Sequence, residues 1–151
     1  MKMLPILILI ALLQHLHAGE VTIFSTDLKG ADGTSYRSSY IVDYKKIAPF
    51  MDTNLFETEF SLSPQAAYDA ALTTMKKTLK KQNRVWDRFL LREIKYGNYS
   101  TKDNIFLGCP FYRVTIAVFL KPSEDNKADG FYSEYLVLPD QTVLTPRVTK
   151  E

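Results

Sequence analysis

Histidine is almost absent from this 151-residue sequence. The two copies, His15 and His17, both precede residue 19, in a stretch that we expect to be removed on export. The mature chain then has no imidazole, which excludes Ser-His-Asp and Cys-His nucleophile activation, histidine acid–base catalysis and most transition-metal sites. We therefore expect a protein that is not an enzyme, with no catalytic, cofactor-binding or metal-binding residue and no cofactor.

Cysteine is nearly as scarce. Cys109 is the one copy, so no disulfide can form within the chain, and packing must stabilise the fold. It lies between Gly108 and Pro110, just before an apolar run. This position favours a buried, inert thiol over a reactive thiol or a link between two chains.

The chain also lacks an excess of either charge. It has 19 Lys and Arg against 17 Asp and Glu, and the N-terminal stretch holds only Lys2 of these, so the mature chain carries a net charge of +1. A nearly neutral surface gives no electrostatic reason to expect nucleic acid or anionic lipid as a partner. The lysines between residues 76 and 81 are explained by a helix end, whose dipole favours cations.

Two groups of acids remain as candidates for chemistry, and glycine-rich phosphate loops and metal-binding cysteine pairs are missing. Glu57 and Glu59 would share one face of a short strand, while Glu124, Asp125 and Asp129 fall in a charged loop that could attract Ca²⁺. Neither group has the spacing of a specific ligand set. Solvated acids on a strand and in a loop are the simpler explanation of both groups, and we favour it.

The first 18 residues have the order of a secretory signal. Lys2 precedes the apolar run 4–13, and a polar stretch then ends at the small residue Ala18. The apolar run is too short to span a hydrocarbon core of about 30 Å. We expect cleavage after Ala18, a secreted or periplasmic protein, and no stable membrane insertion afterwards. In that compartment the Asn-Tyr-Ser sequon at Asn98 is a possible glycosylation site.

The remaining residues, 19–151, suffice for a single domain with one core. The clearest element within them is a helix over about 64–81. Ser63 is a good N-cap, and Pro64 at the first helical position loses no hydrogen bond. One face of the helix is apolar, with large side chains at helical spacing: Tyr68, Leu72, Met75 and Leu79.

Alternating apolar and polar residues predict several strands. The expected ranges are 20–29, 36–45, 85–96, 111–120, 131–138 and 142–145. In the second strand one side carries Tyr36, Ser38, Tyr40, Val42 and Tyr44. This side could be a ligand platform, but we interpret it as cross-strand packing. The range 85–96 also partly fits helical spacing, and we interpret it as a strand.

Together these elements predict an α+β fold in which one main helix packs across an antiparallel sheet of four or more strands. The helix LSPQAAYDAALTTMKK, the runs WDRFLLREI and FYRVTIAVFL, and the closing YLVLPDQTVLTPRV resemble a PepSY-type unit over about 61–148. They are also similar to small exported proteins of unknown function from planctomycete and verrucomicrobial bacteria. PepSY units are proposed to inhibit or chaperone peptidases, so the resemblance implies an exported binding module, and it transfers no functional residue. Cystatins share the layout, but their Gln-x-Val-x-Gly loop is missing.

The sequence thus favours an exported, non-enzymatic binding module for a protein or peptide, which could add a strand to an exposed sheet edge. The alternative is a carrier of a small apolar ligand between helix and sheet, a hypothesis motivated by the 9 Phe, 9 Tyr and 1 Trp. A carboxylate-only enzyme using Glu57 and Glu59 is a third hypothesis. The residues that would bind the ligand or partner are unknown from the sequence.

Overall fold

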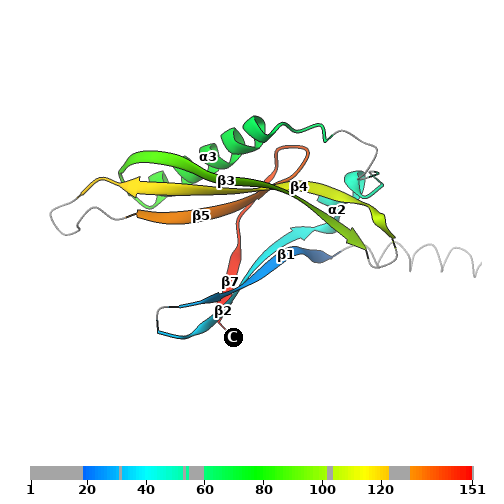
Figure 1. The fold of residues 1–151 in the computed structure, drawn as a ribbon, viewed down its shortest axis with the longest axis horizontal. Coiled ribbons are helices and arrows are strands. Elements are labelled where there is room, and N and C mark those ends of the chain that lie inside the picture. Colours follow the sequence, from blue (N-terminus) through cyan, green and yellow to red (C-terminus); the bar gives the residue numbers. More distant parts are fainter. Residues whose placement is uncertain are drawn as a thin grey trace, which may run out of the picture.

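The structure is a computed structural model, and it describes residues 19–30, 32–52, 54, 60–101, 104–122 and 130–150. The expected signal sequence lies outside these residues. Two antiparallel sheets and one long helix dominate the fold (Figure 1). The elements are β1 Glu20–Lys29, β2 Ser35–Asp43, α2 Tyr44–Ile47, the 3₁₀ helix η1 Ala48–Phe50, α3 Pro64–Lys81, β3 Trp86–Thr101, β4 Asn104–Leu120, β5 Gly130–Val137, β6 Val143–Leu144 and β7 Arg147–Lys150.

The predicted fold class, one main helix across one antiparallel sheet, is wrong. The described part of the chain is mostly strand, and its strands form a three-stranded sheet, in the order β1-β2-β7, and a four-stranded sheet, in the order β3-β4-β5-β6. Only the four-stranded sheet carries α3. The error arose because strand periodicity shows which residues share a face but not which strands pair, so all the strands were assigned to a single sheet.

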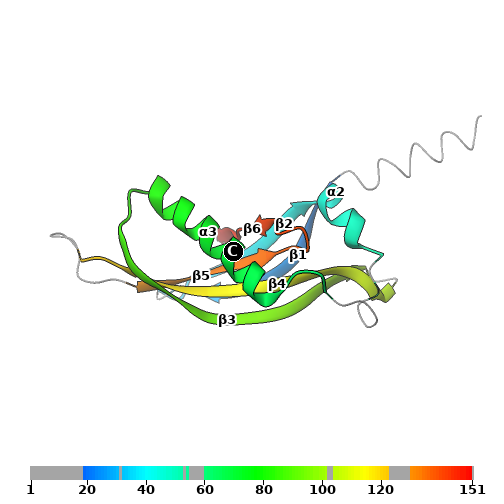
Figure 2. The same cartoon turned by 90° about the horizontal axis from the view of Figure 1, so that it is seen from above.

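Helix α3 spans the predicted range and covers one face of the four-stranded sheet (Figure 2). The Ser63 side chain accepts a hydrogen bond from the amide of Ala66 at 3.1 Å, as expected of an N-cap. The helix buries Ala67, Ala71, Met75 and Leu79, and they pack in one cluster with Val114, Ile116 and Val118 of β4. Burial of these side chains fixes α3 to the sheet.

A second core cluster joins the two sheets near α2. It includes Ile23 and Val42 from the three-stranded sheet and Phe111, Leu136 and Leu144 from the four-stranded sheet. The cluster holds the two sheets together at this end. In Figure 1 the three-stranded sheet extends below the four-stranded sheet, on the side away from α3.

The predicted faces of β3 are wrong, because two bulges interrupt its alternation. The register with β4 shifts between Trp86 and Arg88 and again between Leu91 and Glu93. Each extra residue turns the following side chains to the opposite face. Phe89 therefore packs with Trp86 in the α3 cluster, whereas Leu90, predicted to share the face of Trp86, is half exposed.

Three predicted boundaries are also wrong. β2 ends at Asp43, because the Asp43 side chain accepts from the amide of Lys45 and caps α2. β3 continues beyond its predicted end at Tyr96 to Thr101, because pairing with β4 outweighs the polar composition of this stretch. The predicted strand 142–145 is shortened to β6, and β7, which was not predicted, follows it in the other sheet because the chain crosses between the sheets after β6.

Among the described residues, no helix combines the length and the apolar character needed to cross a membrane.

Candidate functional site

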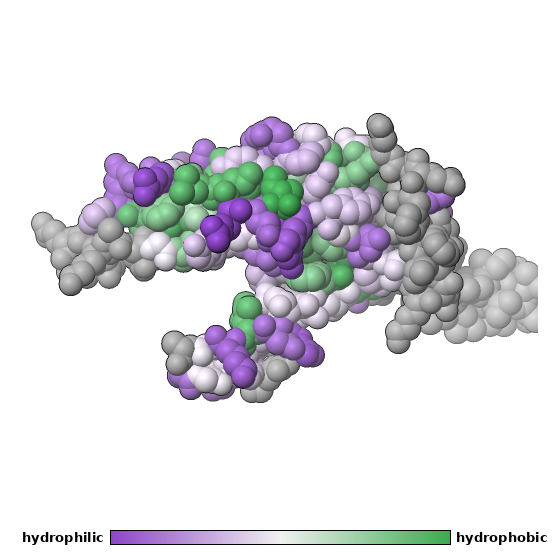
Figure 3. Space-filling model, viewed as in Figure 1, coloured by the Kyte–Doolittle hydropathy of each residue, from purple (hydrophilic) through white to green (hydrophobic). Residues whose placement is uncertain are grey.

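A cleft of about 430 Å³ lies between the two sheets, and it is visible in Figure 3 as a notch between the larger body and the smaller lobe. β1 and β2 form one wall, β5 with part of β4 forms the other, and Thr78 of α3 lies at one end. The 145–148 segment, which carries the chain from β6 to β7, completes the lining. We call this space the intersheet cleft.

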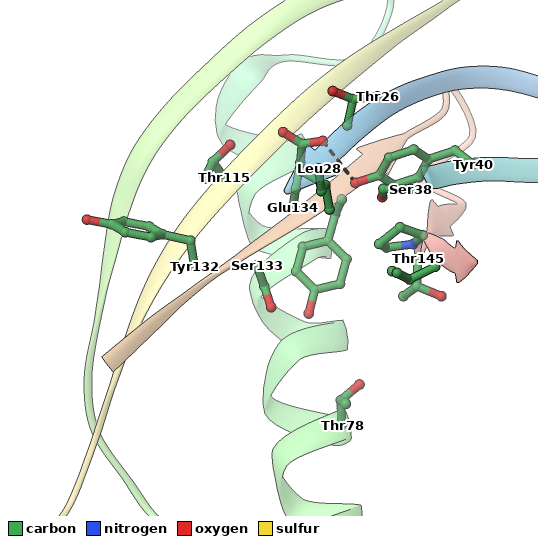
Figure 4. Close-up of a pocket in the computed structure, with 13 residues that line it drawn as sticks. Thr26, Leu28, Ser38, Tyr40, Thr78, Thr115, Tyr132, Ser133, Glu134 and Thr145 are labelled. Atoms are coloured by element: carbon green, nitrogen blue, oxygen red, sulfur yellow. Dashed lines mark hydrogen bonds between the residues drawn. The ribbon is translucent and has the colours of Figure 1, made fainter. Parts of the chain in front are cut away.

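Hydroxyl groups dominate the polar part of its lining (Figure 4). They come from six residues besides the tyrosines: Thr26, Ser38, Thr78, Thr115, Ser133 and Thr145. Hydroxyls both donate and accept hydrogen bonds and carry no charge at neutral pH. The lining therefore suits a ligand with uncharged polar groups, such as a peptide backbone.

Glu134 is the one carboxylate in the lining, and its two oxygens have separate partners. The hydroxyl of Tyr40 donates to Oε1 at 3.1 Å, and Nε of Arg113 lies 3.6 Å from Oε2. Tyr40 is fully buried, and burial together with the neighbouring carboxylate raises the pKa of its hydroxyl far above the usual value. Tyr40 therefore stays protonated and remains a donor to Glu134.

Arg113 links this pair to a wider group of charges and to the other sheet. Its guanidinium lies 5.2 Å from the ring centroid of Phe24 on β1 and 4.0 Å from Oε2 of Glu93. Lys95 lies 2.8 Å from the other oxygen of Glu93 and lowers the pKa of that carboxyl. The negative charge of Glu134 is thus compensated by Arg113.

Three large apolar side chains line the cleft yet remain exposed to solvent. Leu28 of β1, Val148 of β7 and Tyr132 of β5 have exposed fractions of 45%, 57% and 67%. Facing sheets in a closed sandwich bury such residues against each other. Here the two sheets meet at the Tyr40–Glu134 contact and leave these side chains uncovered.

The outer edge of β5 opens into the same cleft. β6 pairs with β5 only at Leu136 and Val137, so the stretch 130–135 has β4 on one side and no strand on the other among the described residues. The amide of Leu138 donates to the carbonyl of Thr142, which places that amide on the β6 side. Backbone groups alternate along a strand, so Glu134 and Tyr132 also direct their N–H and C=O groups to this open side.

The other sheet edges are irregular or short. β1 has a register shift between Thr22 and Phe24, β3 has the two bulges described above, and β7 has only four residues. Bulges, charges and short length are common means of preventing unwanted strand pairing. β5 pairs with β4 without any shift, so its edge is the regular one that stays open.

The structure shows where several residues singled out in the sequence lie. Ser38, Tyr40 and Val42 are buried on one side of β2, and Tyr40 belongs to the core that joins the sheets, which agrees with the packing interpretation. Cys109 is fully buried, as predicted, and burial raises the pKa of its thiol to about 12. Asn98 is exposed on β3, and its glycosylation stays a prediction.

The predicted acid groups, Glu57 with Glu59 and Glu124 with Asp125 and Asp129, lie outside the described residues. Within the described part of the chain, no three His, Cys, Asp or Glu side chains gather in a way that could hold a metal ion.

Sequence reasoning missed Glu134, Tyr132 and Thr78. Their recognition needs the pairing of distant strands, since Glu134 meets Tyr40 across 94 positions of sequence. One local signal was present: Pro146 follows the short apolar run at 143–144 and cannot donate to a ladder, so it marks a point where pairing stops.

Comparisons with protein-family models, curated proteins and solved structures found no match.

Proposed function

We propose that this protein is a binding module that accepts an extended segment of another protein as an additional strand on the outer edge of β5. The observation that carries the proposal is the unpaired, regular edge of β5 at 130–135, which opens into the intersheet cleft. Strand addition to an exposed edge is a common mode of peptide recognition, in which backbone hydrogen bonds supply much of the affinity.

The chemistry of the cleft supports the same proposal. An incoming strand needs free backbone groups, which Tyr132 and Glu134 offer, and uncharged surroundings that do not compete for its amides. The half-exposed Leu28 and Val148 would be covered by such a strand, and burial of apolar surface would add to the affinity.

The alternative, a small apolar ligand held between helix and sheet, has less support. Between α3 and the sheet, Met75 and Leu79 pack in one cluster with side chains of β4 and β5, and each is 1% exposed. Another pocket lies between α3 and the 141–143 segment, where charged and polar residues such as Asp69 and Lys77 contribute to the lining. We therefore do not favour a carrier function.

A proline substitution at Tyr132 tests strand addition directly. Proline has no N–H, and at an outward-facing edge position it removes a donor to the incoming strand without disturbing the ladder to β4. The matched control is Tyr132→Thr, which loses the ring but keeps the amide. The probe is a phage-displayed library of random heptapeptides selected on the wild-type chain, so that no side-chain preference is assumed.

We expect the selected peptides to bind Tyr132→Pro about tenfold more weakly than Tyr132→Thr, because one backbone hydrogen bond is lost and the proline ring blocks close approach. Circular dichroism would verify that both variants are folded. Failure to select any peptide, or equal binding to the two variants, would show that the β5 edge is not the binding site.

The proposal includes export, which the order of residues in the N-terminal stretch supports. Expression with the full sequence in a secreting host, followed by N-terminal sequencing, is expected to give a chain that begins at Gly19. A chain that keeps Met1 in that host would contradict export by this route.

A further inference from the structure

After β6 the chain turns away from β5, so the strand positions opposite Glu134 and Tyr132 are left without a partner strand among the described residues. Leu144 pairs with Leu136 and Val143 with Val137, so a straight continuation would place Pro146 opposite Glu134 and Val148 opposite Tyr132. Pro146 cannot donate to the carbonyl of Glu134. The chain instead turns away, and Val148 pairs with Ser38 of β2.

The orientation of β5 determines which side chains of an antiparallel strand would face the cleft. In an antiparallel pair, two residues that exchange backbone hydrogen bonds point their side chains to the same face. Glu134 and Tyr132 offer their backbone groups on the open edge, and both side chains line the cleft. Residues of the incoming strand opposite them therefore direct their side chains into the cleft, whose lining includes Leu28 and Val148. Figure 4 shows Glu134 and Leu28 in this lining.

The alternate residues of that strand would face the α3 side of the sheet. Ser133 and Tyr135 point to this side, where the hydroxyl of Tyr135 donates to the sulfur of Met75 at 3.4 Å. Thr78 is the nearby helix residue in the lining, and its hydroxyl donates to the carbonyl of Thr74 at 3.0 Å. This side is polar but uncharged, so it suits small side chains with hydroxyl groups.

Charge complementarity limits the ligand further. Glu134 already has Tyr40 and Arg113 as partners, so a cation from the ligand would have to compete with Arg113. An anion would meet the carboxylate itself and would be repelled. A charged side chain placed in the cleft would lose its water without gaining a free counterion.

We propose, on the basis of the proposed function, that the segment runs antiparallel to β5, is uncharged, and alternates apolar side chains toward the cleft with small hydroxyl side chains toward α3. Its apolar residues are then also those whose amides donate to β5. In an antiparallel strand, the residues that face the cleft are thus the same residues that donate to β5. In a parallel strand, the residues that donate to β5 are the alternate ones, whose side chains face α3.

Selective N-methylation of a synthetic peptide tests this coupling. The probe is a fluorescein-labelled heptapeptide of alternating valine and threonine with blocked ends, titrated with the full mature chain and followed by fluorescence polarisation. Two derivatives carry N-methyl groups, one on its valines and the other on its threonines. Both derivatives have the same side chains as the parent, so each is a control for the other.

We expect methylation of the valines to weaken binding at least about tenfold, because hydrogen bonds to Tyr132 and Glu134 are lost. Methylation of the threonines should change the dissociation constant of the peptide less than about threefold, because those amides face away from β5. The opposite order would indicate a parallel strand and would overturn the proposal.

Charge selectivity is tested with the same peptide. Replacement of its valines by lysine, or by glutamate, is expected to weaken binding at least about tenfold, because each charge is buried without a partner. Replacement of its threonines by serine is the neutral control. Binding of a charged peptide as tight as that of the parent would overturn the inferred chemistry.

The two proposals fail in different ways. If strand addition itself is wrong, the parent peptide does not bind, or neither methylated derivative differs from it. If only the inferred chemistry is wrong, binding still responds to methylation but tolerates charge. A dimer detected by light scattering at the concentrations used, whose formation competes with the peptide, would identify a second copy as the occupant and would also contradict the inferred ligand.

Discussion

Tyr40 and Glu134 form the contact at which the two sheets meet on the floor of the intersheet cleft. The Tyr40 hydroxyl comes from β2 of one sheet and the Glu134 carboxylate from β5 of the other, and they are 3.1 Å apart. A buried hydroxyl and a partly buried carboxylate are both costly to leave without a partner. The pair should therefore stabilise the position of the two sheets relative to each other.

Tyr40→Phe should lower the free energy of unfolding by about 1 to 3 kcal/mol, because it removes the donor to a carboxylate that stays partly buried. Urea denaturation followed by circular dichroism measures this change. A double-mutant cycle with Glu134→Gln should give a coupling energy of about 1 kcal/mol. The control Tyr132→Phe changes an exposed side chain and should shift stability by less than about 0.5 kcal/mol. A Tyr40→Phe effect as small as that of the control would contradict the assigned contact.

The Cys109 thiol should lower the free energy of unfolding at alkaline pH. Burial, followed by the charge of Asp140, raises its pKa from 9.0 to about 12, so the folded chain holds the thiol proton more tightly than the unfolded chain. This contribution is complete below a pH of about 9 and is lost as the pH rises toward 12. The free energy of unfolding should therefore fall more steeply between pH 8 and pH 11 for the wild type than for Cys109→Ala. Equal slopes would show that the thiol is not shielded.

The sequence predicted the environment of Cys109 but not that of Glu134. Gly108 and Pro110 beside an apolar run are local signals, and burial of a lone cysteine follows from them. The partners of Glu134 come from β2 and β4, and no local pattern in the sequence around Glu134 points to them. Interactions between distant residues become visible only when the pairing of strands is known.

Strand edges are the elements on which the proposed binding depends. β1 and β3 carry bulges, β7 is short, and β5 alone combines a regular register with an open side among the described strands. Bulges also explain why the predicted faces of β3 were wrong, since each inserts one residue into a pattern of period two. Helix α3 was predicted correctly because its cap and its apolar spacing are local properties.

Close contact between β3 and β4 requires glycine at position 108. A Cβ atom added to Gly108 would overlap the backbone carbonyl of Tyr99 on the neighbouring strand. Gly108→Ala should therefore reduce the free energy of unfolding by about 1 to 3 kcal/mol, as overpacking commonly does. At Gly130 the nearest atom to an added Cβ is the carbonyl oxygen of Val118, at 3.3 Å, a tight contact that needs only a small shift, so Gly130→Ala is the milder comparison. Equal stability of the two variants in urea would contradict the register of β3 and β4.

Over the whole molecule, two sheets share a core at one end and leave a cleft between them at the other. Composition and periodicity predicted the helix and most of the strands. They could not predict that the chain leaves the four-stranded sheet after β6 and that β7 pairs with β2, because this choice depends on the free energies of two competing pairings. That choice is what leaves the edge of β5 open.

Residue-resolved amide hydrogen exchange on the mature chain measures whether this edge is open. In the free protein, the amides of Tyr132 and Glu134 should exchange much faster than those of Phe131, Ser133 and Tyr135, which face β4. Saturation with the alternating valine–threonine peptide should then slow exchange at Tyr132 and Glu134 at least about tenfold and leave the other three amides nearly unchanged. Equal protection of all five amides in the free chain, or no slowing at Tyr132 and Glu134 with peptide bound, would contradict strand addition at β5.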